Sequence, residues 1–150
     1  MRHLRAHSLY LLKDYLNDTV FINTDGASRG NPGPAAIGVT IKDGDGGLLA
    51  SISRRIGVTT NNQAEYRAVI AGLEQAVSLG ARRVMVQSDS ELLVKQINGQ
   101  YKIKNAGLRP LYQEVVRLTG SLESFDITCI PREQNAEADK LANKAFGSKL

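Results

Sequence analysis

The chain is poor in the residues on which many catalytic and structural sites depend. Cys129 is the only cysteine among 150 residues, which excludes an intrachain disulfide. Its surrounding run F-D-I-T-C-I predicts a small core residue in a reducing compartment. The only histidines, His3 and His7, stand near the start of the chain. This composition argues against a Ser-His-Asp or Cys-His mechanism and against a zinc site built from histidine and cysteine.

Long apolar runs are also absent. No stretch approaches the roughly 20 apolar residues that span a bilayer. The basic start of the chain is interrupted by Lys13 and Asp14 and lacks the small-residue cleavage site of a secretory signal. These features predict a cytoplasmic protein without a membrane partner. A net charge of +4 suits a polyanionic partner, but it is equally typical of an ordinary soluble protein.

The hydrophobic pattern predicts three strands, a helix, a strand, two helices, a strand and a last helix. The strands are expected at 19–24, 35–42, 48–58, 82–88 and 125–130, and the helices at 62–79, 91–98, 108–121 and after Asn135, which is expected to cap the last one. The short connections between the first three strands predict an antiparallel meander. The chain is therefore expected to be an α/β protein with a mixed five-stranded sheet, three antiparallel strands followed by two parallel ones, flanked by helices.

Residues 1–18 stand apart from this pattern. Leu9, Leu12 and Leu16 recur at helical spacing, which predicts a short amphipathic extension. Residues 19–150 are expected to form one catalytic domain, and 150 residues in total are typical of a single-domain chain.

Four acidic residues stand where predicted strands or helices begin or end. Asp25 and Asp89 follow the first and fourth strands, Glu65 lies on the inward stripe of the first long helix, and Asp139 lies in the first turns of the last helix. Sites in such sheets form at the carboxyl ends of parallel strands. Four carboxylates in one place repel each other unless divalent cations offset the repulsion, and Mg²⁺ prefers oxygen ligands. The pattern predicts a metal site of the kind that commonly cleaves phosphodiesters.

The segments around these four residues resemble the signatures of type 1 ribonuclease H. They are T-D-G-A-S-R-G-N-P-G, T-N-N-Q-A-E-Y, S-D-S and N-A-E-A-D-K-L-A-N, in this order, and the resemblance covers about residues 19–146. It implies a ribonuclease H-like fold and an endoribonuclease that cuts the RNA strand of RNA/DNA hybrids. It also implies two Mg²⁺ or Mn²⁺ ions per site and products with 5′-phosphate and 3′-hydroxyl ends. No protein partner is expected.

The resemblance also assigns individual residues. Metal binding falls to the four carboxylates: Asp25, Glu65, Asp89 and Asp139. Substrate contacts are expected from Asn31, Asn61, Asn62, Ser90, Lys102 and Lys104. Capping of the helix start is the competing interpretation for Asn61 and Asn62, and the two lysines are equally typical of a solvated surface.

The chain departs from many relatives in two places. The loop before the last carboxylate, P-R-E-Q-N, contains no histidine, and Arg132 is the nearest candidate for its catalytic role, as a group that grips phosphate. A long basic insertion that some members use to hold substrate is missing, as in the short branch of the family. Two alternative functions stay open: a non-catalytic nucleic-acid-binding domain of the same fold, and a related nuclease that prefers double-stranded RNA.

Overall fold

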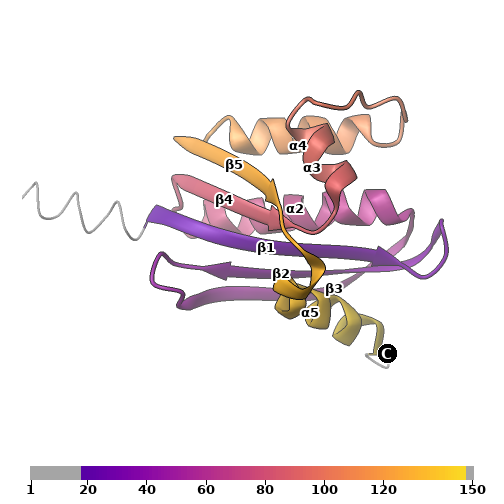
Figure 1. Cartoon of the computed structure of the whole chain (residues 1–150), viewed down its shortest axis with the longest axis horizontal. Helices are drawn as coiled ribbons and strands as arrows, with labels where there is room; N and C mark the ends of the chain where they lie inside the picture. The colour runs from indigo at the N-terminus through magenta and orange to yellow at the C-terminus, as the bar shows by residue number, and fades with distance from the viewer. Residues whose placement is uncertain (1–17, 148–150) are drawn as a thin grey trace, which may run out of the picture.

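One mixed sheet organises the molecule in the computed structural model, which describes residues 18–147 (Figure 1). Its strand order is β3-β2-β1-β4-β5. The strands are β1 Thr19–Ser28, β2 Gly33–Lys42, β3 Leu48–Thr59, β4 Arg83–Ser88 and β5 Ser124–Cys129. β2 pairs antiparallel with both β1 and β3, whereas β4 pairs parallel with both β1 and β5. The predicted mixed sheet is confirmed. The helical extension predicted around Leu9, Leu12 and Leu16 lies outside the described residues.

Helices cover both faces of the sheet. They are α2 Asn61–Ser78, α3 Glu91–Ile97, α4 Arg109–Thr119 and α5 Ala136–Gly147, with a short 3-10 turn η1 at Arg132–Gln134. α2 and α5 both pack on β1, β2 and β3. They lie on opposite faces, because Val39 of β2 faces α2 whereas its neighbour Gly38 faces α5. Within residues 18–147, the structure contains no helix with the length and hydropathy that a membrane span requires.

The longest helix, α2, begins with a capping box. The Thr60 hydroxyl accepts from the Gln63 N–H, and the Gln63 side chain accepts from the Thr60 N–H in return. The cap is therefore Thr60 and not Asn61 or Asn62, which removes the capping interpretation for those two residues. The buried side of α2 carries fully enclosed apolar side chains that join the main core on β1 and β2, including Tyr66, Val69 and Leu73.

β1 is longer than the pattern predicted. Its last residues stay paired with β2 after its pairing with β4 has ended, which leaves a fork between β1 and β4. Parallel pairing with β4 stops at Thr24 and Ser88, but antiparallel pairing with β2 continues as far as Ser28 and Ala35. A strand with a partner on one side keeps its extended conformation, so β1 does not end at Asp25 as predicted. Asp25 therefore lies inside β1, one residue beyond the end of its pairing with β4.

The predicted burial of Cys129 is wrong, because its side chain is exposed. It lies at the end of β5, which is an edge strand of the sheet. Hydrophobic sequence context does not distinguish the end of an edge strand from the middle of a buried one.

Two glycines allow helices to approach the sheet at backbone distance. A Cβ built on Gly26 of β1 would lie 2.3 Å from the Ala64 carbonyl of α2. A Cβ built on Gly38 of β2 would lie 2.0 Å from the Ala138 carbonyl of α5. No side chain fits at either position, so α2 packs directly on β1, which carries Asp25, and α5 packs directly on the neighbouring strand β2.

Replacing Gly38 by alanine is expected to destabilise the fold by about 2 kcal/mol or more, because backbone atoms of α5 must shift to admit the methyl group. Urea unfolding of the purified variant measures this loss. Gly147→Ala is the matched control, since a Cβ there meets no atom within 4 Å, and its effect is expected to stay within about 0.5 kcal/mol. Equal stabilities of the two variants would contradict the seating of α5.

Candidate active site

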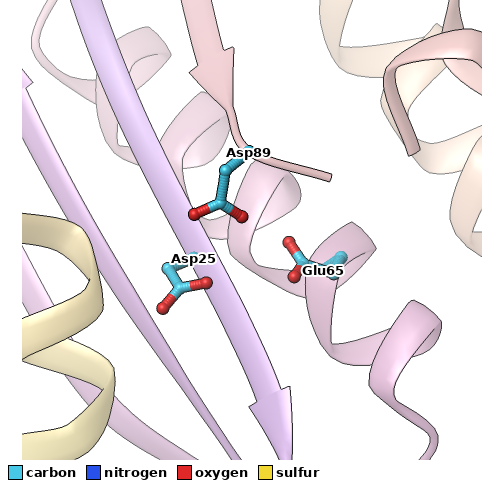
Figure 2. A group of neighbouring side chains, drawn as sticks. All are labelled: Asp25, Glu65 and Asp89. Carbon is cyan, nitrogen blue, oxygen red and sulfur yellow. The ribbon is translucent and has the colours of Figure 1, made fainter. Parts of the chain in front are cut away.

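Three carboxylates from three different elements converge at the fork between β1 and β4 (Figure 2). Asp25 comes from β1, Asp89 directly follows β4, and Glu65 projects from the first turns of α2. One oxygen of each residue lies within 4.8 Å of the others. Asp25 and Glu65 are buried, with only 7% and 5% of their surfaces exposed. The side chains form a compact oxygen cluster beside the end of β4.

A fourth acidic residue, Asp139, belongs to α5, which lies on the face of the sheet opposite α2. Its half-buried carboxyl group lies within hydrogen-bonding reach of the Asp25 carboxyl group. A cavity of about 410 Å³ is lined by all four acidic residues. The same cavity is also lined by Asn61, Ser90, Arg132 and Asn143.

Burial and mutual repulsion dominate the electrostatics of this cavity. Burial, the hydrogen bond with Asp139 and the charges of Asp89 and Asp139 raise the pKa of Asp25 from 3.8 to about 7, against the opposing charge of Arg132. Burial, followed by the charges of Asp25 and Asp89, also raises the pKa of Glu65 well above its ordinary value, and an N–H bond from Gly26 only partly offsets this. The protein therefore holds negative charge here at a cost in folding free energy.

The donor set fits a hard divalent cation. Glu65 Oε2 is buried and has no hydrogen-bond partner within residues 18–147. A buried carboxylate oxygen without a partner is costly unless a cation occupies the space that it faces. All candidate ligand atoms are carboxylate oxygens, the type that Mg²⁺ and Mn²⁺ prefer over nitrogen or sulfur.

A pair of asparagines joins the turn between β1 and β2 to the start of α2. Asn31 Oδ1 accepts from the Asn61 N–H at 3.0 Å, and Asn61 Oδ1 accepts from the Ser28 N–H at 3.2 Å. Both side chains use their oxygens for these contacts, and both residues are exposed. Their amide nitrogens are donors suited to a ligand lying across the mouth of the cavity.

Asn62, the next residue of α2, contacts a residue that lines a second cavity. Its Nδ2 donates to Gln96 Oε1 at 3.3 Å, and Tyr66 donates to the same oxygen at 3.1 Å. Gln96 in turn lines a cavity of about 360 Å³ between α3 and α4. Lys102 lines this second cavity with Arg109, Tyr101 and Tyr112, whereas Lys104 is exposed and lies outside both cavities.

Ser90 and Arg132 flank the carboxylates. The Ser90 hydroxyl accepts from the Leu93 N–H and caps α3, which fixes the chain immediately after Asp89. Arg132 begins η1 and is exposed at the rim of the cavity. Its effect on the pKa of Asp25 places its positive charge close enough to act on the cluster.

The sequence did not reveal the role of Asn135. Asn135 stands directly before α5, where its cap was predicted, and its backbone carbonyl accepts from the Asp139 N–H at 3.1 Å. Its side chain has distant partners that the sequence did not indicate: Nδ2 donates to the Thr24 carbonyl at 2.9 Å and to Asp89 Oδ2 at 3.3 Å. Its Oδ1 accepts from Asn23 Nδ2 at 3.1 Å. An asparagine before a helix is typical of a cap, and these partners more than 45 positions away leave no local signal.

Asn143, also missed, donates to Asp139 Oδ2 at 3.4 Å from one turn further along α5. A donor four residues after an acidic residue on one helix is a signal that sequence spacing does contain.

Comparisons with known proteins agree with this geometry. Residues 23–145 match the family model described as reverse transcriptase-like. The chain is 44% identical over 128 residues to the bifunctional protein Rv2228c of Mycobacterium tuberculosis, covering 85% of this chain and 35% of the relative. It is 45% identical over 122 residues to ribonuclease HI of Halobacterium salinarum, covering 81% of this chain and 61% of the relative. The chain thus spans from about a third to three fifths of these curated relatives.

Solved structures show the same fold. Ribonuclease H1 of Halobacterium salinarum matches with a TM-score of 0.84 and 43% identity, over 86% of this chain and 98% of that one. LC11-RNase H1, solved in complex with an RNA/DNA hybrid, matches with a TM-score of 0.81 and 42% identity, over 85% of this chain and 96% of that one.

Asp25→Asn is expected to stabilise the metal-free protein more at pH 8 than at pH 5. The folded-state pKa of Asp25 is raised, so its charge destabilises the fold increasingly as pH rises from about 4 to 7, and asparagine removes that charge. Each pKa unit corresponds to about 1.4 kcal/mol, so the gain at pH 8 is expected to exceed that at pH 5 by more than about 1 kcal/mol.

Urea unfolding in EDTA at the two pH values measures this difference. Asp126→Asn is the control, because Asp126 is exposed on β5, and its effect is expected to stay within about 0.5 kcal/mol at both values. Parallel stability profiles of the wild type and Asp25→Asn would show that the cluster carries no such repulsion.

Proposed function

The chain belongs to the reverse transcriptase-like family, with type 1 ribonuclease H as its near relatives, and on this premise we propose that it hydrolyses the RNA strand of RNA/DNA hybrids. The observation that carries the proposal is the cluster of Asp25, Glu65 and Asp89, with one oxygen from each within 4.8 Å of the others. A domain that only binds nucleic acid has no use for buried acidic groups, which repel phosphate.

Asp25, Glu65, Asp89 and Asp139 are the proposed ligands of two Mg²⁺ or Mn²⁺ ions. When bound, such ions would supply an activated water molecule and charge stabilisation for the leaving 3′ oxygen, consistent with 5′-phosphate and 3′-hydroxyl products. The protein supplies the fixed positions of these carboxylates on β1, α2, α5 and the end of β4.

Arg132 is proposed to grip phosphate at the rim of the cavity. A guanidinium group stays protonated near neutral pH, so it contributes charge and hydrogen bonds rather than proton transfer. Ser90 lines the same cavity and is proposed as a further substrate contact.

The duplex is proposed to lie across the first turn of α2. Asn31 and Asn61 offer exposed amides near the carboxylates, and recognition of a hybrid relies on shape and on 2′-hydroxyl contacts, which such groups make without sequence preference. Asn62 contacts Gln96 and so lies between the acidic cavity and the cavity that contains Lys102. The uncut strand is proposed to lie at the second cavity, where Lys102 and Arg109 would bind its phosphates.

Asp25→Asn and Glu65→Gln are each expected to lower cleavage of a uniform hybrid by more than about 100-fold, because even partners of metal ligands contribute 10–100-fold. Gel assays compare hybrid, double-stranded RNA and double-stranded DNA, with Mg²⁺, with Mn²⁺ and with EDTA. Cleavage that continues in EDTA would contradict the metal-dependent mechanism. Stronger cleavage of double-stranded RNA would favour the alternative nuclease, and binding without cleavage would favour the non-catalytic domain.

Charge removal at the two cavities is expected to affect different kinetic parameters. Lys102→Ala or Arg109→Ala should raise KM, because each residue is proposed to contact a phosphate of the bound substrate. Each change should also reduce the slope of the logarithm of the binding constant against the logarithm of salt concentration by about one. Arg132→Ala should lower kcat by about 10-fold, because its charge lies beside the reacting phosphate. Lys104→Ala is the control variant, because Lys104 is exposed and lines neither cavity. Steady-state kinetics on the hybrid would contradict the placement if Lys104→Ala raised KM more than Lys102→Ala.

A further inference from the structure

We propose that Asn135 is a positioning residue that holds the metal-binding carboxylates in register, an inference that rests on the proposed function of those carboxylates. Asn135 is 1% exposed and lies behind the acidic cavity rather than among the residues that line it. It touches no space in which a substrate would lie, so any effect on the reaction passes through the groups that it binds.

Both donors and the acceptor of the Asn135 amide have partners, two on β1 and one on the chain that follows β4. Nδ2 donates to the Thr24 carbonyl of β1 and to Asp89 Oδ2, which follows β4. Oδ1 accepts from Asn23 Nδ2. The amide thus spans the gap where parallel pairing between β1 and β4 has stopped, and it replaces the missing ladder contact with a side-chain bridge.

This bridge reaches three of the four acidic residues. Thr24 immediately precedes Asp25, and Asp89 accepts one of the two amide donors directly. The Asn135 carbonyl accepts from the Asp139 N–H at 3.1 Å, which starts α5 and sets the turn that carries Asp139. One residue therefore fixes the spacing among carboxylates contributed by β1, β4 and α5.

The direction of the amide decides whether Asp89 can contact it. A carboxylate oxygen accepts a hydrogen bond from the amide nitrogen, whereas the amide oxygen in the same place would repel it. The contact from Asn23 selects the orientation that presents Nδ2 to Asp89, because a flipped amide would bring two donors together at Asn23. Asn23 is therefore the second member of the positioning device.

The test measures metal binding by the free protein as well as cleavage. Mn²⁺ binding to Asn135→Ala, followed by electron paramagnetic resonance or calorimetry without substrate, is expected to weaken by about 10-fold or more, the usual range for partners of metal ligands. The metal concentration that gives half-maximal cleavage should rise in parallel. Asn23→Ala leaves Asn135 in place and should give a smaller shift in the same direction.

Asn135→Asp separates positioning from simple charge. It keeps the shape of the side chain and adds negative charge, so general electrostatics predicts tighter Mn²⁺ binding, whereas loss of both donors predicts weaker binding. Asn98→Ala is the structural control, because Asn98 donates to the Ile127 carbonyl and bridges α3 to β5 outside the site. Its Mn²⁺ affinity should match that of the wild type.

Unchanged Mn²⁺ affinity in Asn135→Ala, tighter binding in Asn135→Asp, or an equal loss in Asn98→Ala would each overturn the inference. If Asn135→Ala does not fold, Asn135→Asp and Asn23→Ala decide the outcome. Failure of the proposed function is separate: wild-type protein that binds Mn²⁺ but leaves the hybrid intact would reject the nuclease and leave the positioning role standing.

Discussion

The repulsion among buried carboxylates is the interaction on which the rest of this molecule depends. Asp25 and Glu65 are nearly excluded from solvent, and Asp89 and Asp139 lie against them, so the folded state holds charge that an unfolded chain would hydrate. Such an arrangement persists only when the surrounding structure is rigid enough to prevent the side chains from moving apart. Stability given up at a functional site is a common feature of enzymes.

The rigidity comes from backbone contacts more than from the acidic residues themselves. Gly26 and Gly38 let α2 and α5 approach neighbouring strands so closely that no side chain fits between them. The core below the site is continuous across β1, β2 and α2, and Tyr66 is completely buried there although its hydroxyl donates to Gln96. The helix that carries Glu65 is thus anchored by apolar packing on one side and by buried hydrogen bonds on the other. α2 cannot withdraw from the cluster without opening the core.

Local patterns were sufficient to predict the elements and the four acidic residues, but not the contacts among them. Hydrophobic periodicity located the five strands and four helices, and Glu65 was expected to face inward because it shares a stripe with apolar residues. The end of β1 was missed because its extension past Asp25 depends on pairing with β2, which no residue near Asp25 indicates. Cys129 was misjudged because burial of a strand end depends on its place in the sheet. The bridging contacts of the Asn135 side chain were missed because its partners, Thr24 and Asp89, are adjacent to it only in the folded chain.

An acidic cavity in a protein of net charge +4 raises the question of how a polyanion would approach it. The distribution of charge answers this, because the carboxylates are recessed while Arg132 stands exposed at their rim and Lys102 and Arg109 line a separate cavity beyond the first turn of α2. In the proposed complex, a phosphate backbone would meet these cations first and would meet the carboxylates only where metal ions compensate their charge. Binding and chemistry are then carried by different residues. With two cations lining the second cavity, the proposed complex would depend on shape and amide contacts to hold a duplex, and such contacts select geometry rather than sequence.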